Sequence, residues 1–252
     1  MEPILKLADV RKRFGGVVTA DHINMRVFPG EIHGLIGPNG AGKTTALNLI
    51  SGIYEVDGGT ICLGGKDVTR LPAHQRARLG VGRTFQVPRF LRRASIYDNL
   101  MIGLDLANQF GFLRSFFGAR GDELNALLEP LKEIAGLSFN WEDDIAAMPF
   151  GQQKILEIIR ALIAKPKVML IDEPAAGLNS EEILRTMNLI KLVSERGIGV
   201  VVIEHKMDLI MNICHNITCI NFGKVIGQGA PKEISANPAV IEAYLGKEDD
   251  DA

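Results

Sequence analysis

The sequence has few cysteines and no surplus of positive charge. Its three cysteines, Cys62, Cys214 and Cys219, include no pair at C-x-x-C spacing. A sparse and odd set of this kind favours reduced thiols over a disulfide framework and gives no zinc-ligand pattern. The formal net charge of the 252 residues is -2. The basic surplus that is typical of nucleic-acid-binding proteins is therefore missing, and no nucleic-acid partner is expected.

Long hydrophobic runs are missing as well. No stretch approaches the roughly 18 consecutive apolar residues that a membrane-spanning helix needs. Met1–Ile4 opens the chain without the basic and apolar segments of a signal peptide. The acidic run at 248–251 is interpreted as a solvated tail. If the chain serves transport, another subunit must supply the channel.

The hydrophobic residues, 46% of the chain, suffice for one large α/β domain. Alternating or fully apolar stretches predict strands, and apolar residues at helical spacing predict helices. Strands are expected at 4–10, 22–27, 31–36, 60–63, 81–85, 168–171, 198–203, 216–221 and 224–227, and helices at 43–53, 152–163 and 180–193, with short helices after the last strand.

The segment between residues 90 and 150 has a different pattern, in which no strand is convincing. Ser95 is expected to cap a helix that carries Ile96, Leu100, Met101 and Leu104. A second amphipathic helix is expected at 123–135, with Leu124, Leu127, Leu128, Leu131 and Ile134 on its apolar side. We therefore expect one domain over 1–252, in which residues 89–150 form a helical subdomain inserted into a core of 1–88 and 151–252.

A glycine-rich loop follows the third predicted strand and matches the pattern G-x-x-x-x-G-K-[ST]. The matching residues are Gly37, Pro38, Asn39, Gly40, Ala41, Gly42, Lys43 and Thr44. Glycines let backbone N–H groups surround phosphate oxygens, and the helix that follows adds its positive dipole end. Lys43 is expected at the β- and γ-phosphates and the Thr44 hydroxyl at Mg²⁺. A chance match has odds on the order of one in a hundred, so nucleotide binding is the expected function.

Two adjacent carboxylates end the apolar stretch 168–171. Asp172 can hold Mg²⁺, and Glu173 can orient or deprotonate an attacking water. The alternative is a strand that simply ends in charged residues at the surface. The phosphate-binding loop upstream weakens this alternative, so both residues are predicted site residues.

Six motifs occur in an order that identifies a family. Besides the glycine-rich loop and Asp172-Glu173, the sequence carries Arg83-Thr-Phe-Gln86, Gly151-Gln152-Gln153, Ala176-Gly-Leu-Asn179 and Glu204-His205. From about residue 4 to 245, the chain resembles the ATP-binding subunits of ABC transporters. The resemblance implies an α/β fold with a P-loop NTPase (RecA-like) core, an antiparallel β-subdomain and an inserted helical subdomain.

The resemblance implies roles for these residues. Phe14 corresponds to the aromatic that stacks on adenine, and residues 37–45, with Thr45 at the end, correspond to Walker A. Gln86 corresponds to the Q-loop glutamine, which contacts Mg²⁺ and water and senses the membrane subunit. Asp172 corresponds to the Walker B aspartate and Glu173 to the catalytic base or water-orienting residue.

Two further motifs complete the set. Ala176, Gly177, Leu178 and Asn179 correspond to the D-loop, which crosses the dimer interface. His205 corresponds to the switch histidine at the γ-phosphate. Structural alternatives stay open, because Phe14 could be a core aromatic and Gln86 an ordinary loop residue. For His205, its place after a buried strand of an α/β sheet favours function.

The signature motif departs from the family pattern Leu-Ser-Gly-Gly-Gln. The corresponding residues are Met148, Pro149, Phe150, Gly151 and Gln152. Pro149 replaces the serine that donates to the nucleotide of the opposite subunit, and proline has neither a hydroxyl nor an N–H. The helix N-terminus can still present amides to phosphate. We expect a weakened signature face and, as a hypothesis, an asymmetric heterodimer, with a degenerate nucleotide-binding scaffold as the alternative.

Four short strings resemble the larger ATP-binding subunit of branched-chain amino acid importers and of related urea importers. They are Arg83–Gln86, Tyr97–Leu100, Glu173–Asn179 and Ile203–His205. The long stretch 104–121 also fits this branch, whose helical subdomain is enlarged. Its phenylalanines, Phe110, Phe112, Phe116 and Phe117, are interpreted as a helix packed on its neighbour rather than as a docking surface.

This branch implies an ATPase that powers uptake of branched-chain or other hydrophobic amino acids. ATP and Mg²⁺ are the implied cofactors, and the cytoplasmic face of the inner membrane is the implied location. The implied partners are a second nucleotide-binding subunit, two transmembrane permease subunits and, indirectly, a periplasmic binding protein. A urea importer, a lipid or lipopolysaccharide exporter and a soluble ABC ATPase stay open as alternatives.

Overall fold

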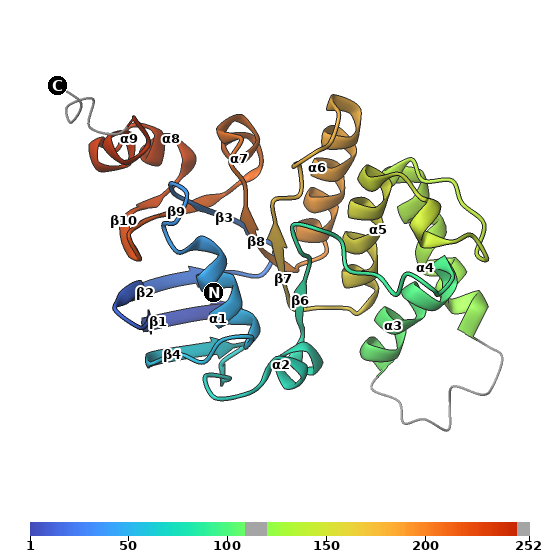
Figure 1. Ribbon diagram of the computed structural model, residues 1–252, viewed down its shortest axis with the longest axis horizontal. Coiled ribbons are helices and arrows are strands. Elements are labelled where there is room, and N and C mark those ends of the chain that lie inside the picture. The colour runs from blue at the N-terminus through green and yellow to red at the C-terminus, as the bar shows by residue number, and fades with distance from the viewer. Residues whose placement is uncertain (109–119, 246–252) are drawn as a thin grey trace.

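Two β-sheets organise the chain in the computed structural model, which describes residues 1–108 and 120–245. The antiparallel sheet has the strand order β2-β1-β4-β5, and the larger sheet has the order β10-β9-β3-β8-β7-β6 (Figure 1). The first sheet contains β1 (Leu5–Phe14), β2 (Val17–Val27), β4 (Gly58–Leu63) and β5 (Lys66–Asp67). The second contains β3 (Ile32–Ile36), β6 (Val81–Arg83), β7 (Val168–Asp172), β8 (Gly199–Ile203), β9 (Asn216–Asn221) and β10 (Lys224–Gly229).

Nine helices of the described residues surround these sheets. They are α1 (Lys43–Ser51), α2 (Ala73–Leu79), α3 (Ile96–Asn108), α4 (Arg120–Ala135), α5 (Phe150–Ile163), α6 (Ser180–Glu195), α7 (Met207–Ile213), α8 (Pro231–Ser235) and α9 (Pro238–Leu245). Within residues 1–108 and 120–245, no helix is both long and apolar enough to cross a membrane.

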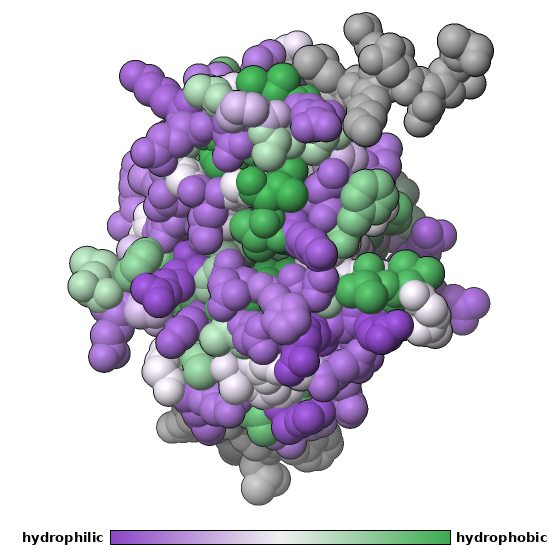
Figure 2. All heavy atoms as spheres, turned by 90° about the vertical axis from the view of Figure 1, so that its left-hand side faces the viewer, coloured by the Kyte–Doolittle hydropathy of each residue, from purple (hydrophilic) through white to green (hydrophobic). Residues whose placement is uncertain are grey.

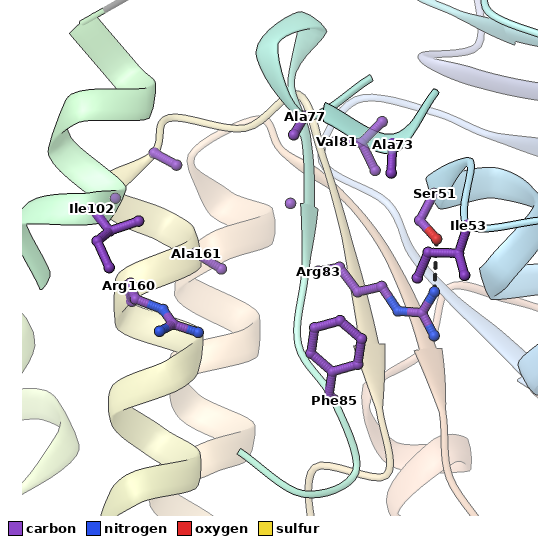
Figure 3. A pocket seen from close by; sticks show the side chains of 13 residues that line it. Ser51, Ile53, Ala73, Ala77, Val81, Arg83, Phe85, Ile102, Arg160 and Ala161 are labelled. Atoms are coloured by element: carbon purple, nitrogen blue, oxygen red, sulfur yellow. Dashed lines mark hydrogen bonds between the residues drawn. The ribbon is translucent and has the colours of Figure 1, made fainter. Parts of the chain in front are cut away.

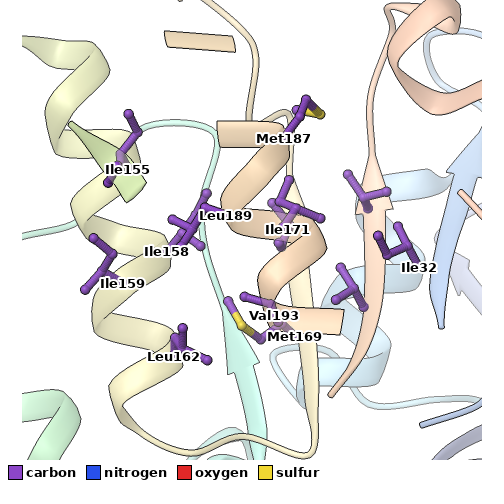
Figure 4. Packing of buried hydrophobic residues seen from close by; sticks show 14 of the residues in the cluster. Ile32, Ile155, Ile158, Ile159, Leu162, Met169, Ile171, Met187, Leu189 and Val193 are labelled. Atoms are coloured by element: carbon purple, nitrogen blue, oxygen red, sulfur yellow. The ribbon is translucent and has the colours of Figure 1, made fainter. Parts of the chain in front are cut away.

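Alternating side chains divide the core into two layers. Leu35, Leu170 and Val201 face α1 and the antiparallel sheet, whereas Ile171 and Val202 face the helices on the other side. This alternation follows from the period of two along a strand. On the second side, α5 and α6 pack against β7 through a layer of isoleucine, leucine, methionine and valine side chains (Figure 4). The predicted α/β fold class is confirmed.

The strands of the N-terminal sheet are longer than predicted. β1 continues to Phe14 and β2 begins at Val17, and a turn at Gly15, with φ +56°, joins them. Apart from the buried Ala20, the added residues are polar or exposed, so they carry no hydrophobic alternation, and cross-strand pairing extends the strands instead. Hydrophilic side chains cover most of the molecular face that includes this sheet and the C-terminal helices (Figure 2).

The helices between residues 95 and 150 agree in part with the prediction. Ser95 caps α3, because its Oγ accepts the backbone N–H of Asp98 at 3.1 Å. Helix α5 begins at Phe150, two residues earlier than predicted. The prediction for Ile134 was wrong, since it is 39% exposed while Ala135 is buried.

Helical spacing explains the correction. The buried stripe of α4 runs through Leu124, Leu128, Leu131 and Ala135, and Ile134 lies about 80° away from it. The sequence analysis also missed α2, β5 and α7, which are short. The phenylalanine cluster of residues 110–117 lies outside the described residues.

Candidate functional site

Three neighbouring parallel strands end at one edge of the larger sheet and bring the predicted residues together. β3 leads into the glycine-rich loop, β7 ends at Asp172, and β8 precedes His205. They enclose a cavity of about 210 Å³, here called the phosphate cavity. It is lined by Thr19, Asn39, Gly40, Ala41, Gly42, Lys43, Thr44, Thr45, Glu173 and His205.

The glycine-rich loop leaves no space for side chains at two of its positions. A Cβ on Gly37 would lie 2.0 Å from the backbone oxygen of Ile220, and a Cβ on Gly42 would lie 2.3 Å from that of Thr19. Gly42 also has a φ of +108°, which L-residues with side chains rarely adopt. Close backbone approach, rather than flexibility, therefore requires these glycines.

Lys43 is buried at the first turn of α1. Its Nζ donates to the carbonyl oxygens of Gly37 at 2.7 Å and Pro38 at 2.8 Å, so the loop curls around the ammonium group. Burial lowers the pKa of Lys43, and the carboxylates of Glu173 and Asp172 oppose this shift. The site thus keeps a cation next to two anions at the open end of a helix.

The C-terminal part of the chain braces the same loop at two points. The backbone N–H of Gly223, in the β9–β10 turn, donates to the carbonyl oxygen of Ala41 at 2.8 Å. The backbone N–H of Gly37 donates to the hydroxyl oxygen of Tyr244, on α9, at 2.8 Å. Burial raises the pKa of Tyr244 to about 12, so its hydroxyl stays neutral.

Glu173 has a backbone conformation that is unusual for a residue with a side chain. Its φ is +47°, in the left-handed region, where strain is frequent at functional sites. The Gln86 amide donates from Nε2 to Glu173 Oε2 at 2.7 Å, and His205 Nε2 lies 2.9 Å from Glu173 Oε1. The two predicted residues from other loops therefore hold this carboxylate from both sides.

Asp172 lies beneath the phosphate cavity and is buried. Burial raises the pKa of its carboxyl group, and the guanidinium of Arg83, 3.8 Å away, opposes the shift. Arg83, at the end of β6, also donates to Ser51 Oγ at 2.7 Å. It therefore contacts both Asp172, the last residue of β7, and Ser51, the last residue of α1. The Thr84 amide continues the β6–β7 pairing by donating to Leu170.

The buried Glu204 connects the loops after β7 and β8. Its Oε1 accepts the backbone N–H of Ala175 at 2.6 Å, and its Oε2 accepts that of His205 at 3.0 Å. One carboxylate therefore holds the residue directly before the predicted D-loop and the predicted switch histidine.

Phe14 does not line the phosphate cavity, although it lies at the end of β1. Its ring is 42% exposed and packs edge-on against Tyr54, with ring centroids 5.1 Å apart. The alternative that Phe14 is a core aromatic is therefore wrong, since nearly half of its surface is open to a ligand.

The signature and D-loop residues form a second group, away from the phosphate cavity. Pro149 is the N-cap of α5 and gives no side-chain cap hydrogen bond. A Cβ on Gly177 would lie 3.4 Å from the Phe150 ring, and one on Gly151 would lie 2.2 Å from the Glu182 carboxylate. Glu182 and Asn179 form the capping box of α6, so both motifs share one compact face.

A groove of about 350 Å³, here called the lateral groove, lies between α3 and α5 on one side and β6, α1 and α2 on the other (Figure 3). Phe85, Ile53 and Ile102 give it apolar walls, and Ile53 and Ile102 are nearly half exposed. Arg83 and Arg89 flank the Phe85 ring at 5.0 and 4.4 Å from its centroid. Gln86, directly after Phe85, connects this groove to Glu173.

Several residues of the site escaped the sequence analysis. Thr19, Gly223 and Tyr244 join it through contacts between distant segments, and no local pattern marks them. Lys154 is different, since a lysine one turn into a predicted apolar helix is a signal for a buried cation.

Two family models match the chain. Residues 20–176 match the model described as ABC transporter, and residues 224–250 match one described as branched-chain amino acid ATP-binding cassette transporter. Among solved structures, an ATP-binding cassette of an ABC transporter in its ADP conformation is similar, with a TM-score of 0.83 and 28% identity. The match covers 98% of this chain and 100% of that one.

Similar curated proteins extend over almost the whole chain. The branched-chain amino acid transport ATP-binding protein BraF of Pseudomonas aeruginosa is 36% identical over 97% of this chain and 98% of its own length. LivG of Escherichia coli, with the same description, is 38% identical over 98% and 99%. LptB of Escherichia coli, an ATP-binding protein of lipopolysaccharide export, is 33% identical over 97% and 98%.

Proposed function

Because this chain belongs to the ABC transporter family and is an ATP-binding, ATP-hydrolysing subunit, we propose that it powers the import of branched-chain amino acids. The observation that carries the substrate class is the match of residues 224–250 to the branched-chain amino acid model. Tyr244, in this segment, accepts a hydrogen bond from the backbone N–H of Gly37, so the segment contacts the phosphate-binding loop directly.

In the proposed reaction, this chain's residues bind ATP and direct a water molecule. The N–H groups of the glycine-rich loop and Lys43 bind the phosphates, and Phe14 offers its open ring to the adenine. Glu173 orients the attacking water and accepts its proton. Gln86 and His205 fix the Glu173 carboxylate, and His205 also faces the γ-phosphate side of the cavity.

The donor set fits Mg²⁺ as the accompanying ion. Thr44 and Asp172 offer oxygen atoms of the kind that this cation prefers. The negative charge of Asp172 also acts on Lys43, whose pKa it raises against the effect of burial. The Gln86 amide donates through its nitrogen to Glu173, which leaves its oxygen for the cation. When bound, Mg²⁺ would neutralise charge on the phosphates.

The second group of residues fits a partner ATP-binding subunit. Residues 149–152 and 176–179 share one face without lining this chain's own cavity. We propose that this face meets the nucleotide of the partner and that the partner differs in sequence, because Pro149 offers neither hydroxyl nor N–H. The resulting dimer would have two unequal ATP sites.

The lateral groove fits a helix of a permease subunit. Its apolar walls and its arginines suit an amphipathic helix that ends in acidic or carbonyl groups. With one permease subunit bound there and a second one bound to the partner ATP-binding subunit, the chain would lie on the cytoplasmic face of the inner membrane, and a periplasmic binding protein would act through the two permeases. In this arrangement, the segment 89–150 would move as a helical subdomain against the core of 1–88 and 151–252.

The test is to co-purify the chain with the subunits encoded beside it and to measure ATPase in proteoliposomes. Stimulation by a binding protein loaded with leucine, and not by one loaded with urea, is the expected result. Stimulation by urea would move the assignment to a urea importer. ATPase that no loaded binding protein stimulates would favour export, the function named for the relative LptB.

A further inference from the structure

Lys154 is a charged residue inside the protein that the proposed reaction does not use. It lies one turn into α5 and is only 4% exposed, whereas lysines are almost never fully buried without a partner. Its Nζ donates to the backbone carbonyl oxygen of Glu173 at 2.6 Å. Among the described residues, no carboxylate lies within 4.0 Å of it as an ion-pair partner.

The surroundings of Lys154 are strongly acidic. The carboxylates of Glu204, Glu173, Glu157 and Asp172 all act on its charge and oppose the lowering of its pKa by burial. The lysine is thus a shared counter-ion for the acidic groups that surround the predicted catalytic carboxylate. A chain with an uncharged residue here would lose one of the cations that offset these anions, although Arg83 would still pair with Asp172 at 3.8 Å and Arg160 with Glu157 at 3.5 Å.

The hydrogen bond from Lys154 is accepted by Glu173, the residue whose backbone has the unusual left-handed conformation. With φ at +47°, Glu173 departs from the extended backbone directly after the last residue of strand β7, Asp172. Such a conformation costs on the order of 1–3 kcal/mol and persists where surrounding groups enforce it. A charged donor on the carbonyl oxygen is a group of this kind.

Helix α5 gives Lys154 a fixed base. Ile158 and Leu162 point toward β7 and α6, and Met169 and Ile171 meet them from the sheet (Figure 4). The position of the lysine therefore follows the position of the helix. The same helix begins at Phe150, and Lys154 Nζ lies 5.5 Å from the centroid of the Phe150 ring.

We propose that Lys154 is a positioning residue, which holds the Glu173 backbone in its catalytic conformation and couples it to the N-terminus of α5. Phe150 and Gly177 form the outer end of this connection, and Glu173 forms the inner end. A displacement of the signature face then changes the position of the carboxylate that directs water. This inference rests on the proposed function, because it assigns Glu173 to ATP hydrolysis.

The experiment compares Lys154→Met, Lys154→Arg and Lys154→Gln in the complete transporter. We expect Lys154→Met to leave the Kd for a fluorescent ATP analogue within about twofold, because Lys154 does not line the phosphate cavity, and to lower kcat about tenfold or more. Lys154→Arg should restore most of the kcat, since it keeps a charged donor. Lys132→Met, a partly buried lysine on α4, is the matched control and should keep the wild-type kcat.

Several outcomes would overturn the inference. One is an unchanged kcat in Lys154→Met, and another is a parallel loss of ATP affinity, which indicates a merely structural residue. If Lys154→Met does not fold, Lys154→Gln and Lys154→Arg decide, because equal kcat in both excludes a positioning role for the charge. A wild-type complex that does not hydrolyse ATP would refute the proposed function itself, before any variant is compared.

Discussion

His205 Nε2 lies 2.9 Å from Glu173 Oε1, although the two residues are 32 positions apart in the chain. They follow neighbouring parallel strands, β7 and β8, which pair from Val168 to Asp172. Parallel pairing thus brings two loops to one place at the carboxyl edge of the sheet, where ligands bind in open α/β sheets. The following predictions test what this edge does.

Glu173→Gln should bind ATP and fail to hydrolyse it. The amide keeps the shape of the side chain but cannot accept a proton from water, so kcat should fall about 100-fold or more. Steady-state ATPase and equilibrium binding of a fluorescent ATP analogue measure the two effects. The exposed Glu195→Gln on α6 is the control. Wild-type hydrolysis by a folded Glu173→Gln protein would refute the assignment.

Pro149→Ser should raise the ATPase of the assembled complex. The serine would restore a hydroxyl and a backbone N–H at the N-cap of α5, where both can donate to the partner's nucleotide. The comparison is kcat of complexes at saturating ATP. Pro72→Ser, at the N-cap of α2, is the same change outside the site. Unchanged or lower activity would argue against a weakened signature face.

Tyr244→Phe should weaken ATP binding more than it slows hydrolysis. The variant leaves the Gly37 N–H without its acceptor, at a cost of about 1–2 kcal/mol, and loosens the loop that binds phosphate. We expect a KM for ATP raised several-fold, about 5-fold, with kcat nearly constant. Tyr97→Phe, in an aromatic contact with Trp141, is the control. A KM equal to that of the wild type would show that the brace is dispensable.

Arg76→Met should destabilise the fold by about 3 kcal/mol. The guanidinium donates to the carbonyl oxygens of Leu49, Ile50, Thr69 and Leu71, and three of its hydrogen bonds are fully or largely closed to water. Its removal takes one donor from each of these carbonyl groups, of which Leu49 keeps the backbone N–H of Gly52 at 3.3 Å. Urea unfolding measures the loss, with the exposed Arg78→Met of the same helix as a comparison. A shift below about 0.5 kcal/mol would contradict the role.

Glu157→Gln should change how stability depends on pH. Burial raises the pKa of Glu157, whose carboxylate accepts the amides of Phe85 and Arg89 on either side of Gln86. The folded chain therefore binds more protons than the unfolded chain, and this group's contribution to stability falls as pH rises above about 4.5. Urea unfolding from pH 4 to 7 should show a shallower decline in the variant. Identical slopes would contradict the raised pKa.

Local chemistry explains which parts of the molecule the sequence predicts. The glycine-rich loop and Asp172-Glu173 are short segments in which the residue types are dictated by phosphate, metal and water chemistry. The buried strands β7 and β8 are equally local, because a short apolar run between breaks permits little else.

Contacts between distant segments explain the rest. Arg76 is charged, so its sequence context predicts exposure, yet four carbonyl groups from other segments enclose it. Tyr244 acts through one hydroxyl that reaches a loop 207 positions away. The role of Lys154 depends on the φ of Glu173, and a tertiary constraint of this kind has no signature in the spacing of residues.

The two braces of the phosphate-binding loop also fix when the ATP site is complete during synthesis. The loop leaves the ribosome early, but its hydrogen bonds to Gly223 and Tyr244 come from residues that are translated about 200 codons later. A nascent chain that has formed β3 and α1 therefore still lacks the outer support of its nucleotide site. The loop has both of these hydrogen bonds only when α9 has docked, so the nucleotide site is complete only after nearly the whole described chain has been made and folded.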